Sequence, residues 1–401
     1  MRKIIVCTAK YSDNLGDGVI SDCVEYLIRR LLPEATVISL DISGRQGFKL
    51  EGEEGLSLSK RVFLNTPNFL KPLITLTAWF LIFRPRLKSA INSIDFSDTE
   101  LLVFGGGQLI NDVALNFPLK VSFIAKEAQK NNLNYTFNAI GVGQKLSYWG
   151  RLLFNEVFSS PSFVGLYTRD KESEQRFESL FKSAIAPQLT YDSALWSKEC
   201  YQVTRNVPRQ NTKFIGVGVS HPKELSSHVN DSNDDLETKV EFWIHIIKEL
   251  LSNGFKPVLF TNGSRDDHAF MQQVVETLIS LGLINDVKVS QRCYNPKELV
   301  DVIAEFSGII SHRLHANIVA NALGIPSVAL TWDKKVQSYF DLIDRGDCCF
   351  KDTSPPNEIV ARLRCALQEG ISEELFARLK KTSLEKLKEQ IGLASEGSPR
   401  I

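Results

Sequence analysis

Short runs of β-branched and other apolar residues alternate with helix-period segments along the chain, and this alternation most limits the folds available to it. Strands are expected at residues 3–9, 36–42, 100–106, 135–142, 163–170 and 189–195, and again at 213–220, 257–262, 287–291, 308–311 and 327–332. Helical spacing between strands is clear at residues 235–251. Strands that alternate with helices predict parallel sheets joined by right-handed crossovers.

The two series of strands are separated by a polar stretch at residues 197–212. We therefore predict an α/β fold with two Rossmann-like domains that face each other across a cleft. The expected boundaries are 1–200 for the N-terminal domain, 212–370 for the C-terminal domain, 371–392 for a last helix and 393–401 for a frayed tail. Open α/β sheets bind ligands at the carboxyl ends of their strands, so the cleft is the expected site.

Charge and cysteine content exclude several classes of function. The 401 residues carry 47 basic and 47 acidic side chains, so no basic excess exists to neutralise nucleic-acid phosphates. The seven cysteines are scattered and form no CxxC pair, which argues against a zinc site and against disulfide chemistry. Because the first residues also lack a long apolar signal core, we expect a reduced, cytoplasmic protein.

An uncharged apolar run at residues 72–83 allows two interpretations. It is too short to span a bilayer, which needs about 20 apolar residues. It is either a buried helix, in the first domain or in a dimer contact, or a patch that holds the protein peripherally at an anionic leaflet. The second interpretation rests on Trp79, on the phenylalanines of the run and on flanking basic residues, which are Lys71, Arg84, Arg86 and Lys88. Homo-oligomerisation stays open.

Two glycine-containing turns follow strands of the first series. In "YSDNLGDGVISD", Asn14 and Asp17 come directly after the first strand, either as ligand-facing groups or as an ordinary turn with Asp17 as helix N-cap. In "LLVFGGGQLIND", Gly105, Gly106 and Gly107 precede Gln108, and three consecutive glycines allow a ligand or another backbone to approach closely. Neither turn matches the dinucleotide fingerprint or the P-loop.

Cationic side chains follow three other expected strands. Arg169 begins a helix after one strand, where it either faces a ligand or pairs with the adjacent helix. Arg313 and His315 fall in the first turn of the helix 313–324, where positive charge opposes the helix dipole unless an anion binds there. His315 is otherwise a core histidine, and neighbouring His312 is expected to be structural. Lys334 and Lys335 follow the strand 327–332, and one of them is expected to reach the site.

Taken together, five blocks resemble the polysaccharide pyruvyl transferase family. They are "NLGDGVI", "FGGGQLIND", "TRDKES", "SHRLHANIVANALGIPSVAL" and "WDKKV", and they occur in the family's order over about residues 4–345. The resemblance implies a GT-B-like arrangement of two Rossmann-like domains. It also implies transfer of the pyruvyl group of phosphoenolpyruvate to a sugar of a cell-surface polysaccharide precursor, as a cyclic ketal.

By position, the family pattern implies that His315 is the catalytic acid and that Arg313 assists it. The donor phosphoenolpyruvate would be bound by Arg169, Arg313 and Lys335, with Trp332 standing where relatives commonly have tyrosine. The acceptor side is expected to include Asn14, Asp17, Gly105, Gly106, Gly107 and Gln108. The sugar acceptor is nucleotide-linked or lipid-linked, and neither a cofactor nor a metal is expected. The alternatives are a nucleotide-sugar glycosyltransferase of the same fold and a non-catalytic assembly subunit.

Overall fold

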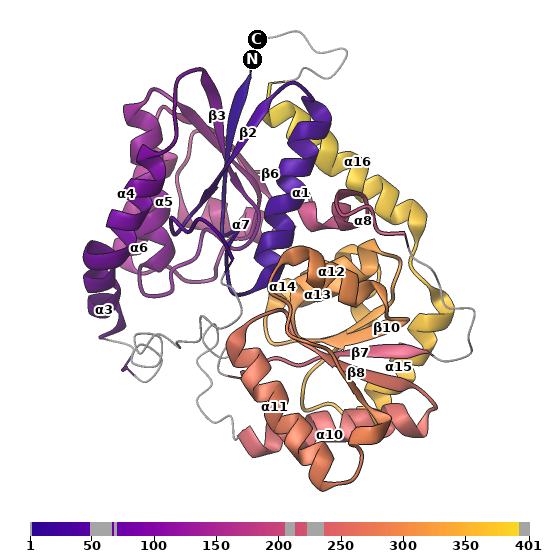
Figure 1. The fold of residues 1–401 in the computed structure, drawn as a ribbon. Coiled ribbons are helices and arrows are strands. Elements are labelled where there is room, and N and C mark those ends of the chain that lie inside the picture. Colours follow the sequence, from indigo (N-terminus) through magenta and orange to yellow (C-terminus); the bar gives the residue numbers. More distant parts are fainter. Residues whose placement is uncertain (1, 49–65, 68–69, 205–212, 223–235, 393–401) are drawn as a thin grey trace. The chain divides into compact units, whose positions relative to one another are not determined.

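The computed structural model describes residues 2–48, 66–67, 70–204, 213–222 and 236–392 (Figure 1). The chain divides into two compact units. The N-terminal unit comprises Met1–Ser12, Ile20–Ser193 and Leu379–Ile401, and the C-terminal unit comprises Asp13–Val19 and Ala194–Arg378. Of the polar stretch 197–212, predicted as a linker, residues 197–200 form a short helix, and residues 205–212 lie outside the described residues, as does the tail 393–401.

The N-terminal unit is built on a six-stranded parallel sheet with strand order β2-β1-β3-β4-β5-β6. Its strands are β1 (Lys3–Thr8), β2 (Thr36–Asp41), β3 (Thr99–Gly105), β4 (Asn134–Ile140), β5 (Phe163–Thr168) and β6 (Gln188–Leu189). Its helices are α1 (Leu15–Leu31), α3 (Lys71–Ala78), the π-helical turn η1 (Trp79–Phe83), α4 (Arg84–Asn92), α5 (Asn116–Lys130), α6 (Tyr148–Phe158), α7 (Lys171–Leu180) and the end of α16 (Glu373–Gln390). In Figure 1, α4, α5 and α6 lie along one face of this sheet and α1 and α16 along the other.

The C-terminal unit holds a second six-stranded parallel sheet, with strand order β12-β11-β10-β7-β8-β9. Its strands are β7 (Phe214–Gly218), β8 (Lys256–Phe260), β9 (Lys288–Val289), β10 (Gly308–Ser311), β11 (Ser327–Leu330) and β12 (Cys349–Phe350). Its helical segments are η2 (Ser193–Trp196), α8 (Ser197–Cys200), α10 (Leu236–Ser252), α11 (Arg265–Ser280), η3 (Ile284–Asp286), α12 (Pro296–Ala304), α13 (Leu314–Ala322), α14 (Lys334–Leu342), η4 (Gly346–Cys348) and α15 (Pro356–Glu369). The predicted α/β class, with two Rossmann-like units, is confirmed.

Both sheets are covered on both faces, which explains why their central strands are continuous apolar runs without alternation. In the N-terminal unit, residues Ile4–Cys7 of β1 are fully buried. Aromatic side chains fill much of that core, and the rings of Phe104 and Phe137 stack with centroids 4.6 Å apart. The core of the C-terminal unit is mainly aliphatic. All nine residues of α13 are buried.

The apolar run 72–83 forms a helix that is buried on one side only. Trp79 is 6% exposed and its ring packs edge-on against Phe123 of α5, so Trp79 belongs to the core and is no surface anchor. Pro85 has no amide hydrogen to donate to the preceding turn, and the chain widens there into η1, where the Arg84 amide donates to the Trp79 carbonyl. Phe80, in the same turn, is exposed. None of the described helices is long and apolar enough to cross a membrane.

Candidate active site

The carboxyl edge of the C-terminal sheet collects most of the cationic residues singled out in the sequence. Strands β10 and β11 are paired in parallel, with Ser311 beside Ala329, so the loops that follow them are neighbours. The indole Nε1 of Trp332, after β11, donates to the main-chain oxygen of His312, after β10, at 3.0 Å. The two sequence blocks that contain Arg313 and Lys335 therefore meet at one edge of one sheet.

Arg313 occupies the N-cap position of α13 and is held by a carboxylate. Its Nε and Nη2 atoms donate to Asp267 over distances of 2.6 to 3.0 Å, and the Asp267 side chain is fully buried in the first turn of α11. The main-chain N–H of His221, after β7, also donates to Asp267, at 2.8 Å. This buried pair fixes the plane of the guanidinium and balances the positive charge that opposes the dipole of α13.

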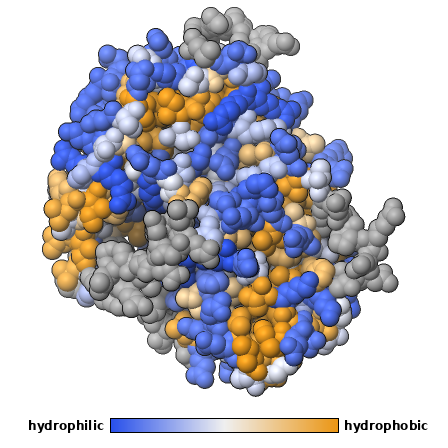
Figure 2. Space-filling view, in the orientation of Figure 1, coloured by the Kyte–Doolittle hydropathy of each residue, from blue (hydrophilic) through white to orange (hydrophobic). Residues whose placement is uncertain are grey.

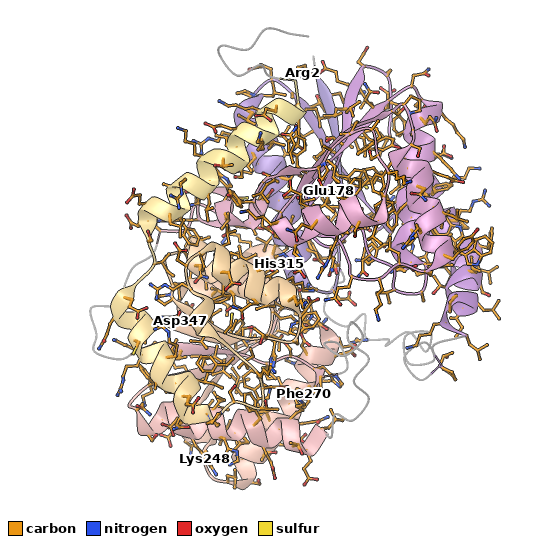
Figure 3. The ribbon with its side chains drawn as sticks, turned by 180° about the vertical axis from the view of Figure 1, so that it is seen from behind. Arg2, Glu178, Lys248, Phe270, His315 and Asp347 are labelled. Carbon is orange, nitrogen blue, oxygen red and sulfur yellow. The ribbon has the colours of Figure 1, made fainter. Side chains whose placement is uncertain are left out.

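His315 is the second residue of α13 and is 8% exposed (Figure 3). The turn after β1 lies directly against it. A Cβ atom added to Gly16 would lie 2.6 Å from the Cβ of His315 and 3.1 Å from its Nδ1. Real Cβ atoms essentially never come as close as 2.6 Å, so only glycine at position 16 lets the first turn of α1 approach His315 this closely.

The turn after β1 is also anchored to the loop after β8. The Leu15 amide donates to the carbonyl of Asn262 at 2.9 Å, and the Asn262 side chain donates to the Asn14 side chain at 3.3 Å. Asp17 lies inside α1, two residues after its start, so it is not the N-cap of that helix. Asn14 and Asp17, expected on the acceptor side with the N-terminal domain, thus belong by their contacts to the C-terminal unit that carries His315.

The two lysines after β11 have different surroundings. Lys335 is partly buried, with its Nζ 4.2 Å from the centre of the Trp332 ring and 3.6 Å from Asp333. Lys334 is exposed. Asp333 is the N-cap of α14 and accepts from the Lys335 amide, which orients this first turn. The position of Lys335 against Trp332 favours it over Lys334 as the lysine of the site.

Arg169 lies in the N-terminal unit, at the carboxyl end of β5, and is 7% exposed. Its guanidinium lies 3.4 Å from Asp170 and 3.9 Å from Asp192. It also covers Gly141, where an added Cβ would lie 2.8 Å from its Nη2. Asp170 at the same time caps α7 by accepting from the Ser173 amide. The sequence also allowed Arg169 to pair with acidic groups of the protein itself. Asp170 and Asp192 make such pairs and hold Arg169 at this edge of the sheet.

Gly105 is the last residue of β3, and the two glycines that follow it differ in what requires them. Gly106 has a φ of +61°, and a Cβ there would lie 1.9 Å from the side chain of Ile20 in α1. Gly107 also has a positive φ, of +70°, but no atom lies within 4 Å of where its Cβ would be. Gly107 accepts from the Gly141 amide at 2.8 Å, so this turn and Arg169 share Gly141 as a neighbour. Gly106 is explained by packing, whereas the Cβ position of Gly107 borders open space and Gln108 is half-buried.

His312 lies beneath the site and is uncharged. Burial lowers its pKa to about 3, and its ring packs edge-on against Trp243 with centroids 5.3 Å apart. Neither ring nitrogen has a hydrogen-bond partner among the described residues. The structure thus gives His312 the structural place expected from the sequence.

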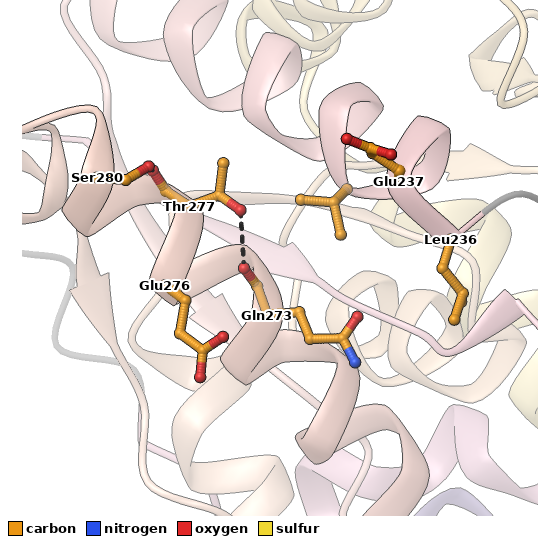
Figure 4. A pocket seen from close by; sticks show the side chains of 7 residues that line it. Leu236, Glu237, Gln273, Glu276, Thr277 and Ser280 are labelled. Atoms are coloured by element: carbon orange, nitrogen blue, oxygen red, sulfur yellow. Dashed lines mark hydrogen bonds between the residues drawn. The ribbon is translucent and has the colours of Figure 1, made fainter.

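Two surface grooves of the C-terminal unit do not suit an anionic donor. One, of about 430 Å³, lies between α10 and α11 and is lined by Glu237 and Glu276, with Thr277 bonded to the Gln273 carbonyl (Figure 4). The other, of about 540 Å³, holds arginines that are already paired, such as Arg362 with Glu369. Within the described ranges, no group of three His, Cys, Asp or Glu side chains is arranged to hold a metal ion.

Sequence reasoning missed the carboxylates that orient these cations. Asp267 lies 46 residues before Arg313, in the first turn of α11. Asn262 and Asp192 were also missed. The available signal was their position, because each follows a strand of a parallel sheet at the edge where ligands bind.

Comparisons with known proteins identify a matching family and solved structures of similar fold. The family described as polysaccharide pyruvyl transferase matches residues 14–334. No curated protein matches the sequence.

Among solved structures, a putative UDP-N-acetylglucosamine 2-epimerase from Listeria monocytogenes has a TM-score of 0.56 at 10% identity, covering 100% of this chain and 99% of that one. The UDP-GlcNAc 2-epimerase of Methanocaldococcus jannaschii, in complex with UDP-GlcNAc and UDP, has a TM-score of 0.53 at 10% identity, covering 98% and 100%. The S. aureus MnaA-UDP co-structure has a TM-score of 0.50 at 11% identity, covering 100% and 99%. At these identities the likeness shows the fold, which agrees with the GT-B-like expectation.

Proposed function

The chain belongs to the polysaccharide pyruvyl transferase family, and on that premise we propose that it moves the pyruvyl group of phosphoenolpyruvate onto a sugar of a polysaccharide precursor. The product is a cyclic ketal, and phosphate is released. The family match over residues 14–334 includes every residue to which a donor role is given below except Lys335, which follows its last position directly.

The donor explains the gathering of cations. Phosphoenolpyruvate carries a carboxylate and a phosphate on a three-carbon frame, so it needs several positive groups at close range. We assign donor binding to Arg313 and Lys335 of the C-terminal unit and to Arg169 of the N-terminal unit. Asp267 acts on Arg313 as a positioning residue, because it fixes the direction of the guanidinium.

We propose that His315 supplies the proton that starts the reaction. Transfer of its proton to C3 converts the methylene of the donor into a methyl group and leaves C2 electron-poor. A sugar hydroxyl adds to C2 and loses its proton. The bond between C2 and the phosphate oxygen breaks, phosphate departs with the electron pair, and a second hydroxyl closes the ketal. The cations stabilise the negative charge of the departing phosphate.

One observation carries this proposal, the convergence of Gly16, Arg313 and His315 at the carboxyl edge of the C-terminal sheet. A buried histidine beside a fixed guanidinium, under a glycine turn that approaches without a side chain, suits a small, anionic, planar substrate.

For the acceptor, we propose a sugar carried on a nucleotide or on a lipid. Proteins of similar fold are named for UDP-sugars and were solved with UDP, which supports a nucleotide-linked acceptor. The fold alone leaves a nucleotide-sugar glycosyltransferase, the alternative drawn from the sequence, as the second candidate function. The two candidates release different products, so they can be separated directly.

The test is incubation of the full chain with phosphoenolpyruvate and a panel of nucleotide-linked and lipid-linked sugars. We expect acceptor-dependent release of phosphate and a product heavier by a pyruvate ketal. The variant His315→Gln should lower turnover by roughly 10²–10⁴-fold while donor binding persists. Release of a nucleoside diphosphate with no ketal would point to the glycosyltransferase. Full cellular function of His315→Gln would point to a non-catalytic subunit.

A further inference from the structure

Exposed apolar side chains are concentrated in one layer of the N-terminal unit. Of the twelve large hydrophobic side chains that are exposed among the described residues, eight lie on two short segments. The first segment contributes Leu70, Leu73, Phe80, Leu81 and Ile82, and the second contributes Tyr148, Trp149 and Leu152. The other four are Val164, Val289 and a pair at the end of α11, Ile279 and Leu281.

The first segment is the outer face of α3 and η1. Leu81 is 73% exposed and Leu73 is 63% exposed, whereas Trp79 on the opposite side is in the core. The helix is thus held to the protein by its inner face and presents an apolar outer face. Figure 2 shows apolar residues gathered on the surface in the region where Figure 1 places α3. An apolar patch of this kind marks an interaction surface.

The second segment is the first turn of α6, and it lies toward the same end of the helical layer. Helix α6 follows β4, so its first turn lies toward the carboxyl ends of the strands. Helix α4 leads into the amino end of β3. The start of the α3–η1–α4 segment, which is α3, therefore lies at the opposite end, toward the carboxyl ends of the strands. Tyr148 and Trp149 are 71% and 64% exposed and contact each other edge-on at 5.4 Å. Tyrosine and tryptophan favour the boundary between water and lipid, because each has an apolar ring and a polar handle.

Within the two stretches of sequence the charges have one sign, whereas the carboxylate of Asp112 lies against the first turn of α6, where it accepts from the Ser147 amide at 2.8 Å. No Asp or Glu occurs from residue 70 to 94 or from 142 to 155. Basic residues occur in both stretches, namely Lys71, Arg84, Arg86 and Lys88 in the first and Lys145 and Arg151 in the second. Arg84 lies with its guanidinium carbon 5.9 Å from the centre of the Phe80 ring, so cation and apolar face are parts of one surface.

We propose that this surface, residues 70–88 with the first turn of α6, docks the protein on an anionic phospholipid bilayer. The apolar face enters the headgroup boundary, and the basic residues contact lipid phosphates. A second copy of the chain is a poorer occupant, because a symmetric contact brings the same patch of both copies together. The basic residues of the first segment would then repel each other across the contact, because residues 70–94 contain no acid to neutralise them.

Sedimentation of the full chain with phospholipid vesicles tests the proposal. We expect binding to vesicles that contain phosphatidylglycerol, weak binding to phosphatidylcholine alone, and loss of binding at high salt. The double variant Phe80→Ser, Leu81→Ser should bind these vesicles at least about tenfold more weakly than the wild type. The triple variant Arg84→Gln, Arg86→Gln, Lys88→Gln should lose roughly a hundredfold, because each basic residue contributes roughly fivefold.

Two matched controls separate docking from general effects. Ile279→Ser removes an equally exposed apolar side chain from α11, and the triple variant Lys248→Gln, Arg364→Gln, Lys381→Gln removes three exposed cations elsewhere. Both should bind vesicles as the wild type does. Because the substituted side chains at 80, 81, 84, 86 and 88 are exposed, thermal unfolding should stay near the wild-type value.

The proposal does not depend on which reaction the protein catalyses, so its failure would not affect the proposed function. Absence of wild-type binding to phosphatidylglycerol vesicles at low salt would overturn it. A dimer in sedimentation velocity that Phe80→Ser, Leu81→Ser dissociates, with no vesicle binding, would assign the face to a second copy. If the control variants lost vesicle binding to the same extent, the binding would depend on overall net charge and hydrophobicity and not on this surface, and the proposal would be wrong.

Discussion

Gly16 lies so close to His315 that a methyl group on Gly16 would come within 2.6 Å of the Cβ of the histidine. The contact joins a turn near the start of the chain to the helix that carries the proposed acid. The Cβ of His315 is fixed by the buried helix α13, so a side chain at position 16 cannot be accommodated by rotation of the imidazole alone.

We expect Gly16→Ala to displace either the turn or the imidazole. Such overpacking costs about 1–3 kcal/mol of unfolding free energy. Turnover should fall at least tenfold, measured as phosphate release from phosphoenolpyruvate. Gly47→Ala is the matched control, because no atom lies within 4 Å of a Cβ there. Wild-type turnover of Gly16→Ala would mean that the contact is not needed for the geometry of His315.

Lys335 and Lys334 should differ in donor binding. We expect Lys335→Ala to weaken binding of phosphoenolpyruvate about tenfold or more, because its ammonium is held against Trp332 at the site. Lys334→Ala should change little, since Lys334 is exposed. Arg169→Ala should also weaken binding. Calorimetric titration of the donor into each variant measures the effects, and a larger loss at Lys334 than at Lys335 would exchange their roles.

Arg313→Lys should be costly although the charge is kept. A lysine cannot reproduce the two-point contact that Arg313 makes with Asp267, and the fully buried carboxylate would lose part of its hydrogen bonding. Breaking a buried ion pair by removing one partner typically costs about 3–5 kcal/mol. Denaturant unfolding should therefore show a loss for both Arg313→Lys and Asp267→Asn.

A role in donor binding adds a second effect to that loss. We expect Arg313→Lys to weaken phosphoenolpyruvate binding more than Asp267→Asn does, because Asp267 acts only through the arginine. Binding is measured at a temperature at which both variants remain folded. Equal effects of the two substitutions on binding would reduce Arg313 to a structural residue.

Lys120 predicts a pH dependence of stability. Burial lowers its pKa to about 7, assisted by the positive charges of Arg45 and Arg86, while the unfolded chain keeps the ordinary value of about 10.4. Between these values the unfolded state binds a proton that the folded state does not, so stability rises with pH. Below pH 7 the folded chain carries the full cost of a buried ammonium, whose described hydrogen-bond partner is Ser43.

The substitution Lys120→Met should therefore stabilise the protein at pH 6, and its advantage should shrink by up to about 1.4 kcal/mol per pH unit between pH 7 and pH 10. Thermal or urea unfolding of both proteins across this range measures the difference. Lys130→Met is the control, because its side chain is 68% exposed and should add no such dependence. A pH-independent difference between Lys120→Met and the wild type would contradict the assigned pKa.

The sequence alone determined the fold class and the places where chemistry concentrates. Apolar runs bounded by turns located the strands of both sheets except β6 and β12, because burial on both faces makes the strands continuously apolar. The predicted strand 189–195 meets β6 only at Leu189, and residues 193–196 form the helical turn η2 instead. Strand β12 was missed because two residues, Cys349 and Phe350, carry no periodicity. Chain order also brought Arg313 and His315 together, since both belong to the same loop and helix.

Tertiary structure decided everything that depends on contacts between distant segments. No local pattern links Asp267 to Arg313, or Gly16 to His315, because a parallel sheet gathers loops from strands that are far apart in sequence. The apolar run 72–83 was ambiguous for the same reason. Its composition allowed burial or exposure, and the packing of Trp79 on Phe123 decided which side faces the core and left Leu81 on the surface.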